Sequence, residues 1–234
     1  NRQFSLDDIP NMSIFQLVEQ SNKDNLDNVA LDVRTSKNDF NRGIKITYRT
    51  YIERMKKSAK SSLDMGIGVN DIIPIILPNI PEARILLYSN SIVGATSYQI
   101  SPLMPSAQLA SILSENQVKN IFIFEQFYEK YSEVLRKSSV ENIVLLDGTE
   151  SLPTSLKVLK EVKDFLTGTR AKNMDKIFKL DRRIVPWSEY DRASRYISGN
   201  ITPYYDENHV AAIIGTSGTS GTSKGVCMSD KNIN

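Results

Sequence analysis

The amino-acid sequence predicts an α/β fold with a mostly parallel β-sheet flanked by helices. The alternation of two sequence patterns and the length of the chain lead to this class. Short apolar runs alternate with segments whose apolar residues recur every three or four positions, which is typical of strand–helix–strand units. Such units place helices on both faces of a parallel sheet, so its strands are mostly apolar. With 234 residues, the chain is long enough to bury a sizeable core.

The first 66 residues are predicted to contain a helix, a hairpin and a longer helix. Ser13–Gln16 has the spacing of a capping box, and apolar residues then follow at helical intervals. The segments Val29–Val33 and Ile44–Tyr48 are rich in β-branched residues and enclose a turn-rich stretch, which predicts that they pair. From Tyr48 the helical period continues to Gly66, where a helix usually stops.

The alternation of strands and helices begins near residue 72. Pro81 and Gly94 mark one crossover helix well, because proline favours the first turn of a helix and glycine follows its end. Asn79 is expected to cap this helix. The predicted strands span 72–77, 96–100, 120–124 and 142–146, and the predicted helices start at 81 and 106 and cover 127–135.

Residues 150–205 are predicted to be a connecting segment with at most one helix. Within it, 170–183 holds six basic residues against Asp175 and Asp181 and lacks a strand period. A solvated surface is the ordinary interpretation of such a stretch, and a strip that binds phosphate or a partner is the alternative.

The composition excludes several classes of function. The 29 basic and 27 acidic residues give a net charge of +2, which argues for neither a nucleic-acid partner nor an anionic membrane surface. No run approaches the roughly 18 apolar residues of a membrane span, so a soluble protein is expected. The single cysteine, Cys227, excludes an internal disulfide and suits a reducing cytoplasm.

The single histidine and the single cysteine are expected to be structural. His209 precedes an apolar run, where a cap or surface role is expected and nucleotide contact is the alternative. Cys227 lies in a predicted strand, where a small buried residue is the common outcome. One histidine and one cysteine also exclude a metal site built from several of either residue.

The segment that carries chemistry is the loop 215–225, which follows the apolar run Val210–Ile214. It contains four glycines, three threonines, three serines and one lysine. Glycines let successive backbone N–H groups turn toward one point, hydroxyls add donors, and Lys224 adds a cation. These features suit phosphate oxygens. A flexible linker and a P-loop that opens a helix are the alternatives, although Val226–Met228 has the pattern of a strand.

The stretch 216–226 reads TSGTSGTSKGV and resembles the signature T-S-G-T-T-G-x-P-K-G-V of the adenylate-forming superfamily, with two mismatches. That superfamily includes acyl-CoA synthetases, luciferases and adenylation domains of peptide synthetases. Ser229 and Asn232 follow at the family's spacing. Further landmarks that resemble the family are Thr47-Tyr48, Gly66 to Asp71, Leu77-Pro78-Asn79 with Glu82, Val93-Gly94-Ala95 and Ser101-Pro102.

Three positions depart from the family pattern. Ser223 replaces its proline, Asp230 stands where histidine is usual, and Gly215 stands where an aromatic residue is frequent. The loss of the proline removes a fixed φ angle and lets the unfolded loop sample more conformations. The other two changes concern packing around the nucleotide and carboxylate pockets.

The resemblance implies that residues 1–234 are the N-terminal part of the large AMP-binding domain of an adenylate-forming ligase. It implies a βαβ core at about 44–150, a connecting segment at about 150–205 and a phosphate loop at 215–226. The intact protein would activate a carboxylic acid as an acyl-adenylate with ATP and Mg²⁺, and pass it to the thiol of coenzyme A. A peptide-synthetase-type adenylation domain with a carrier protein is the first alternative, and a truncated, non-catalytic nucleotide-binding or scaffold module is the second.

The resemblance also assigns roles within the loop. The β- and γ-phosphates would be wrapped by Thr216, Ser217, Gly218, Thr219, Ser220 and Gly221. Lys224 would lie beside the departing pyrophosphate, with Mg²⁺ held largely by ATP. No catalytic residue and no metal ligand is assigned within the chain. We therefore expect the 234 residues alone not to turn over.

Overall fold

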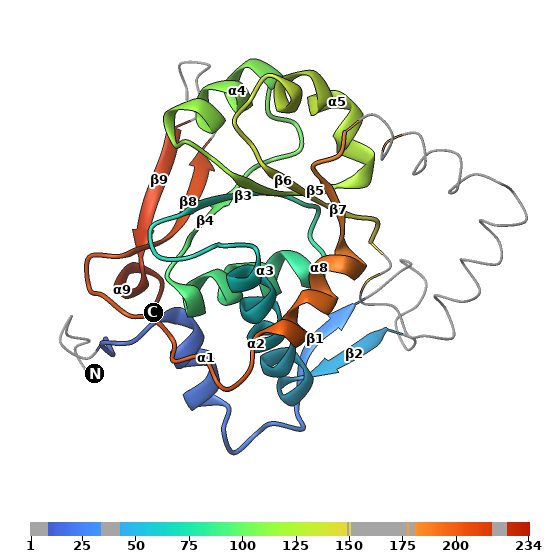
Figure 1. Ribbon diagram of the computed structural model, residues 1–234. Coiled ribbons are helices and arrows are strands. Elements are labelled where there is room, and N and C mark those ends of the chain that lie inside the picture. The colour runs from blue at the N-terminus through green and yellow to red at the C-terminus, as the bar shows by residue number, and fades with distance from the viewer. Residues whose placement is uncertain (1–8, 34–42, 149, 151–176, 178–180, 217–223) are drawn as a thin grey trace, which may run out of the picture.

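The computed structural model describes residues 9–33, 43–148, 150, 177, 181–216 and 224–234 (Figure 1). Seven strands of the described part form one sheet: β3 (Ile72–Ile76), β4 (Thr96–Gln99), β5 (Asn120–Phe124), β6 (Asn142–Leu146), β7 (Ile184–Pro186), β8 (Val210–Thr216) and β9 (Lys224–Ser229). Their order is β7-β6-β5-β3-β4-β8-β9. All neighbours pair in parallel except β8 and β9, which are antiparallel. The predicted α/β class with a mostly parallel sheet is confirmed.

Helices cover both faces of this sheet (Figure 1). One layer consists of α4 (Ser106–Glu115) and α5 (Glu125–Arg136), and the other of α2 (Tyr48–Asp64), α3 (Pro81–Val93) and α8 (Trp187–Ala193). Helix α1 (Ile14–Ser21) packs against α3, and the antiparallel hairpin of β1 (Val29–Val33) and β2 (Ile44–Thr47) lies beside α2. Two short elements, η2 (Ser194–Tyr196) and α9 (Asp230–Ile233), follow α8 and β9.

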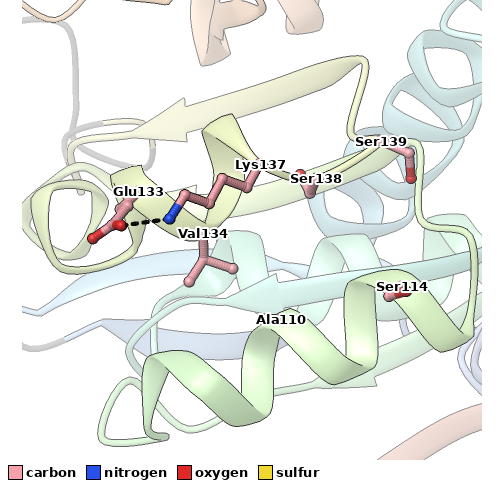
Figure 2. Close-up of a pocket in the computed structure, with 7 residues that line it drawn as sticks. All are labelled: Ala110, Ser114, Glu133, Val134, Lys137, Ser138 and Ser139. Carbon is pink, nitrogen blue, oxygen red and sulfur yellow. Dashed lines mark hydrogen bonds and ion pairs between the residues drawn. The ribbon is translucent and has the colours of Figure 1, made fainter.

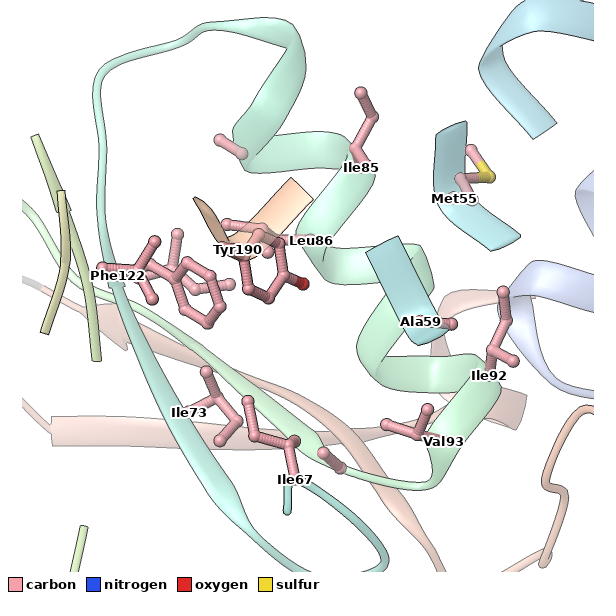
Figure 3. Close-up of a cluster of buried hydrophobic side chains, with 14 of the residues drawn as sticks. Met55, Ala59, Ile67, Ile73, Ile85, Leu86, Ile92, Val93, Phe122 and Tyr190 are labelled. Carbon is pink, nitrogen blue, oxygen red and sulfur yellow. The ribbon is translucent and has the colours of Figure 1, made fainter. Parts of the chain in front are cut away.

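The strands divide their side chains between two hydrophobic clusters, one under each helical layer. Strand β5 shows this directly, because Phe122 belongs to the cluster under α2, α3 and α8, whereas Ile121 and Ile123 belong to the cluster under α4 and α5. In the first cluster, Phe122 lies near Tyr190 of α8 and Leu86 of α3 (Figure 3). Each large apolar side chain that is fully buried stabilises the fold by roughly 1.5–3 kcal/mol.

A buried hydroxyl network fixes α8 on α2. The hydroxyl of Tyr190 donates to the carbonyl of Ser58 over 2.9 Å, and it lies 2.8 Å and 2.9 Å from the hydroxyls of Ser58 and Ser62. Burial raises the pKa of the Tyr190 phenol to about 12, so it stays protonated and able to donate. Trp187 packs edge-on against Phe122. The tyrosine and tryptophan are therefore packing residues.

The helix ends confirm some predictions and correct others. Ser13 and Gln16 form the predicted capping box of α1, and α3 ends at Gly94, whose φ of 78° is in the left-handed region that favours glycine. The expectation that Asn79 caps α3 is wrong: its N-cap is Ile80, whose side chain makes no capping bond. Pro81 needs no N–H partner at the first helical position, which reduces the need for a polar cap.

Strand β7 was not predicted from the sequence. It has only three residues, Ile184–Pro186, which is too short to display a period of two, and α8 follows it directly. Most of the basic stretch 170–183 lies outside the described residues. Arg183 within it binds Asp181 through two nitrogens, over 2.9 Å and 2.7 Å, and donates to the carbonyl of Val140 over 2.8 Å. This arginine therefore has a structural role.

In the part of the chain that the structure describes, no helix is both long and apolar enough to cross a membrane.

Candidate functional site

The hairpin of β8 and β9 brings the two ends of the predicted phosphate loop together. Thr216 and Lys224 form its last cross-strand pair, and Lys224 is exposed. The predicted ligands Ser217, Gly218, Thr219, Ser220 and Gly221 lie outside the described residues. Lys224 opens a strand rather than a helix, so the alternative of a P-loop is wrong. Because both flanks are strands of the same sheet, the loop is also not a simple interdomain linker.

The hairpin places the loop at the carboxyl edge of the parallel sheet. Strand β8 runs parallel to β4, with Ser97 paired to Ala212 and Gln99 paired to Ile214. Strand β4 also pairs in parallel with β3, so β3, β4 and β8 all end at the same edge. In open α/β sheets, ligands bind beyond the carboxyl ends of the strands. The loop is therefore where this architecture usually holds a ligand.

A close approach between β4 and the hairpin explains why the residue after Lys224 is a glycine. A Cβ atom added to Gly225 would lie 2.8 Å from Cγ2 of Ile213 and 3.1 Å from the hydroxyl of Tyr98. Tyr98 is buried, and burial is the main cause that raises the pKa of its phenol. Gly225 faces Gly215 across the hairpin, one pair below Lys224. The ring of Tyr98 thus supports the backbone immediately next to the predicted cation.

At its other end the hairpin is clamped by a buried histidine and a buried aspartate. Nε2 of His209 lies 3.0 Å from the carbonyl oxygen of Gly94, and Nδ1 lies 3.4 Å from a carboxylate oxygen of Asp230. The other carboxylate oxygen of Asp230 accepts from the backbone N–H of Ile14, at the start of α1, over 2.8 Å. A carboxylate is favourable there, because the first turn of a helix presents unpaired N–H groups.

This clamp corrects one expectation and explains one departure from the family pattern. His209 is 6% exposed, so the expected cap or surface role is wrong. Its partners lie 115 and 21 residues away, which no local pattern reveals. Asp230, where the family usually has histidine, is 2% exposed and joins β9 to both His209 and α1.

Cys227 is exposed, so the expectation of a small buried residue is wrong. Its strand, β9, is the last in the strand order, and its first four residues are exposed. Hydropathy identifies a strand here but does not distinguish an edge strand from a central one. Val226 on β9 and Ile214 on β8 are likewise 47% and 44% exposed.

Two hollows lie away from the loop. The larger, of about 420 Å³, lies between the C-terminal parts of α4 and α5 (Figure 2). Lys137 and Glu133 form an ion pair of 2.7 Å there. The end of α4 leads into the amino end of β5, and the end of α5 leads into the amino end of β6. The smaller, of about 130 Å³, lies beside Phe15 and Ile92, below the usual 300–1,000 Å³ of a ligand pocket. Neither adjoins the carboxyl ends of the strands.

A group of charged side chains lies near the start of α3 and the end of β6. Glu82 is 1% exposed and pairs with Arg54 over 2.6 Å. Burial raises the pKa of Glu150 to about 7, with contributions from the charges of Asp147 and Glu82. The backbone N–H of Asp147 donates to Glu150 over 2.9 Å, which opposes the shift. No group of three potential metal ligands occurs among the described residues.

The comparisons with known proteins identify the family. The pattern of the family described as AMP-binding enzyme matches residues 18–234, and the chain belongs to this family. It is 24% identical over 191 residues to a long-chain-fatty-acid–CoA ligase of Bacillus subtilis, covering 82% of this chain and 33% of that protein. It is 22% identical over 194 residues to a peroxisomal trans-cinnamate:CoA ligase of Petunia hybrida, covering 81% and 31%.

Solved structures show the same fold. The adenylation domain of a carboxylate reductase from Mycobacterium chelonae has a TM-score of 0.73 at 17% identity, covering 96% of this chain and 36% of that one. A long-chain-fatty-acid–CoA ligase from Archaeoglobus fulgidus has a TM-score of 0.67 at 17% identity, covering 95% and 37%. The chain thus spans about a third of the length of these relatives.

Sequence reasoning missed the contribution of β4 to the site. Tyr98 and Gln99 end this strand beside the hairpin, on opposite faces of the sheet. No local pattern in the sequence could have found them, because the place of β4 next to β8 is a property of the whole sheet.

We expect Gly225→Ala to destabilise the protein by about 1–3 kcal/mol, because the new Cβ overlaps Ile213 and Tyr98. Urea denaturation measures the change. The double variant Gly225→Ala with Ile213→Ala should lose less stability than the sum of the single variants, since the second substitution removes the nearest atom. Strict additivity of the two losses would contradict this close approach.

We expect Asp230→Ala to lower the free energy of unfolding by about 2–4 kcal/mol, because His209 and the N–H of Ile14 each lose a buried partner. The matched control is Asp24→Ala, whose side chain is exposed and should change stability little. If the two variants unfold at the same urea concentration, the clamp has no energetic role.

The raised pKa of Glu150 predicts a pH-dependent effect of its substitution. A carboxyl whose pKa rises on folding binds its proton more tightly in the native state, so stability falls as the pH rises from about 4.3 toward 7. Glu150→Gln should therefore stabilise the protein at pH 8, on the order of 2 kcal/mol, and much less at pH 4.5. Equal gains at both pH values, measured by urea denaturation, would rule out this titration.

Proposed function

We propose that the protein carrying this chain activates a carboxylic acid with ATP, forming an acyl-adenylate and pyrophosphate. The observation that carries the proposal is the β8–β9 hairpin, which holds Thr216 opposite Lys224 at the carboxyl edge of the sheet. The residues between them have the composition of a phosphate-binding loop. Membership of the AMP-binding enzyme family supports the same reaction.

In this reaction a carboxylate oxygen attacks the α-phosphorus of ATP, and the bond between that phosphorus and pyrophosphate breaks. The acid is already ionised at neutral pH, so the attack needs no general base, and positioning and charge stabilisation supply the catalysis. We assign contact with the β- and γ-phosphates to Thr216, Ser217, Gly218, Thr219, Ser220 and Gly221. Lys224 would offset the charge that develops on pyrophosphate. Magnesium would accompany ATP and offset part of the negative charge of its phosphates.

For the second half-reaction we propose transfer of the acyl group to coenzyme A, whose thiol loses its proton and displaces AMP. The sequence relatives from Bacillus subtilis and Petunia hybrida are named as CoA ligases, which favours this acceptor. An A-PCP didomain of a carboxylic acid reductase is also among the structural neighbours, which keeps a carrier-protein thiol as the second candidate. The low cysteine content supports a cytoplasmic location. A non-catalytic scaffold is the remaining candidate.

We expect Lys224→Ala in the full-length protein to reduce ATP–pyrophosphate exchange by about 100-fold or more, as loss of a charge-stabilising group does in other enzymes. The assay uses fatty, aromatic and amino acids in parallel. Lys231→Ala is the matched control, because Lys231 is exposed and lies in α9, which follows the end of β9 opposite to the loop. Unchanged exchange in Lys224→Ala would contradict the assignment. Absence of exchange with every acid in the unsubstituted protein would favour the scaffold.

A further inference from the structure

Gln99 is the last residue of β4 and points to the α3 side of the sheet. Two residues earlier, Ser97 accepts a hydrogen bond from Asn90 of α3 over 3.0 Å, and alternate residues of a strand share a face. Gln99 pairs with Ile214 of β8, which lies two residues, or about 7 Å, before the end of that strand at Thr216. Gln99 is thus beside the strand that leads into the loop.

The side-chain nitrogen of Gln99 lacks a hydrogen-bond partner among the described residues. Its Nε2 atom is buried, and no acceptor reaches it within the described part of the chain. A buried amide group without a partner is costly and uncommon in native proteins, so it calls for a specific explanation. A ligand oxygen that arrives on binding is one such explanation.

Lys224 lies on the same face of the sheet as this amide. Ile214 pairs with Val226, and the next pair on that face is Thr216 with Lys224. Directly opposed residues of an antiparallel pair share a face, so Gln99, Ile214, Val226 and Lys224 follow one another along it. Ile214 separates the amide from the lysine and is 44% exposed. A ligand that reaches both groups must therefore carry several acceptor oxygens along its length.

We propose that Gln99 donates a hydrogen bond from its amide to a phosphate oxygen of ATP. This inference rests on the proposed function. A polyphosphate carries oxygens along a chain and can contact Gln99 and Lys224 together, whereas the single carboxylate of an acid substrate can reach only one of them. Gln99 is then a binding residue outside the Gly/Ser/Thr loop, contributed by the neighbouring strand.

The test is Gln99→Met in the full-length protein, which removes the donor and nearly keeps the volume. The dissociation constants of ATP and of tripolyphosphate should rise about tenfold or more, because a hydrogen bond to a charged oxygen is lost. The affinity for adenosine should not change. The melting temperature without nucleotide should stay the same or rise, because an unpaired buried amide is removed, while the shift that ATP produces should shrink.

Ser91→Ala is the matched control. Its hydroxyl is also buried and without a partner among the described residues, but it lies near the end of α3, away from the loop. It should leave the ATP-induced shift intact. A lower melting temperature of Gln99→Met without nucleotide, or an unchanged affinity for ATP, would overturn the proposal. If the unsubstituted protein binds neither ATP nor tripolyphosphate, the proposed function itself fails.

Discussion

The antiparallel pairing of β8 with β9 is the constraint on which the rest of the site depends. It sets Thr216 opposite Lys224, so the two ends of an eleven-residue Gly/Ser/Thr/Lys segment meet instead of diverging. A loop with fixed ends loses less entropy when it closes around a ligand than a free segment of the same length. The hairpin therefore gives the two ends of the proposed phosphate loop a defined position in the sheet.

The hairpin is held by contacts from segments far away in the sequence. Strand β4 supports one side, where the hydroxyl of Tyr98 comes close to the backbone of Gly225. At the opposite end, His209 and Asp230 connect the hairpin to Gly94 and to the start of α1. Buried polar groups of this kind specify one arrangement, because each of them is costly to leave unpaired. The register of the two strands is thus fixed at both ends.

Much of the fold could be predicted because its signals are local. Strands β3, β5 and β6 are short apolar runs, and the left-handed Gly94 ends a helix that Pro81 begins. The remaining features depend on distant partners or on the place of a strand in the sheet. The burial of His209 comes from residues 21 and 115 positions away, and the exposure of Cys227 follows from the end position of β9 in the strand order.

For the candidate site, the sequence predicted the loop but not its surroundings. The glycines, hydroxyls and Lys224 are contiguous, so composition and resemblance both indicate them. Gln99 lies more than 100 residues earlier and becomes a neighbour only because β4 and β8 pair in parallel. Strand order is a property of the whole sheet, and no window of the sequence carries it.

A crystal structure of the full-length protein with ATP and Mg²⁺ tests the central claim most directly. The account predicts that the β- and γ-phosphates lie beyond the end of the β8–β9 hairpin, with a phosphate oxygen within hydrogen-bond distance of Nζ of Lys224. A triphosphate bound elsewhere, such as in the groove between α4 and α5, would contradict it.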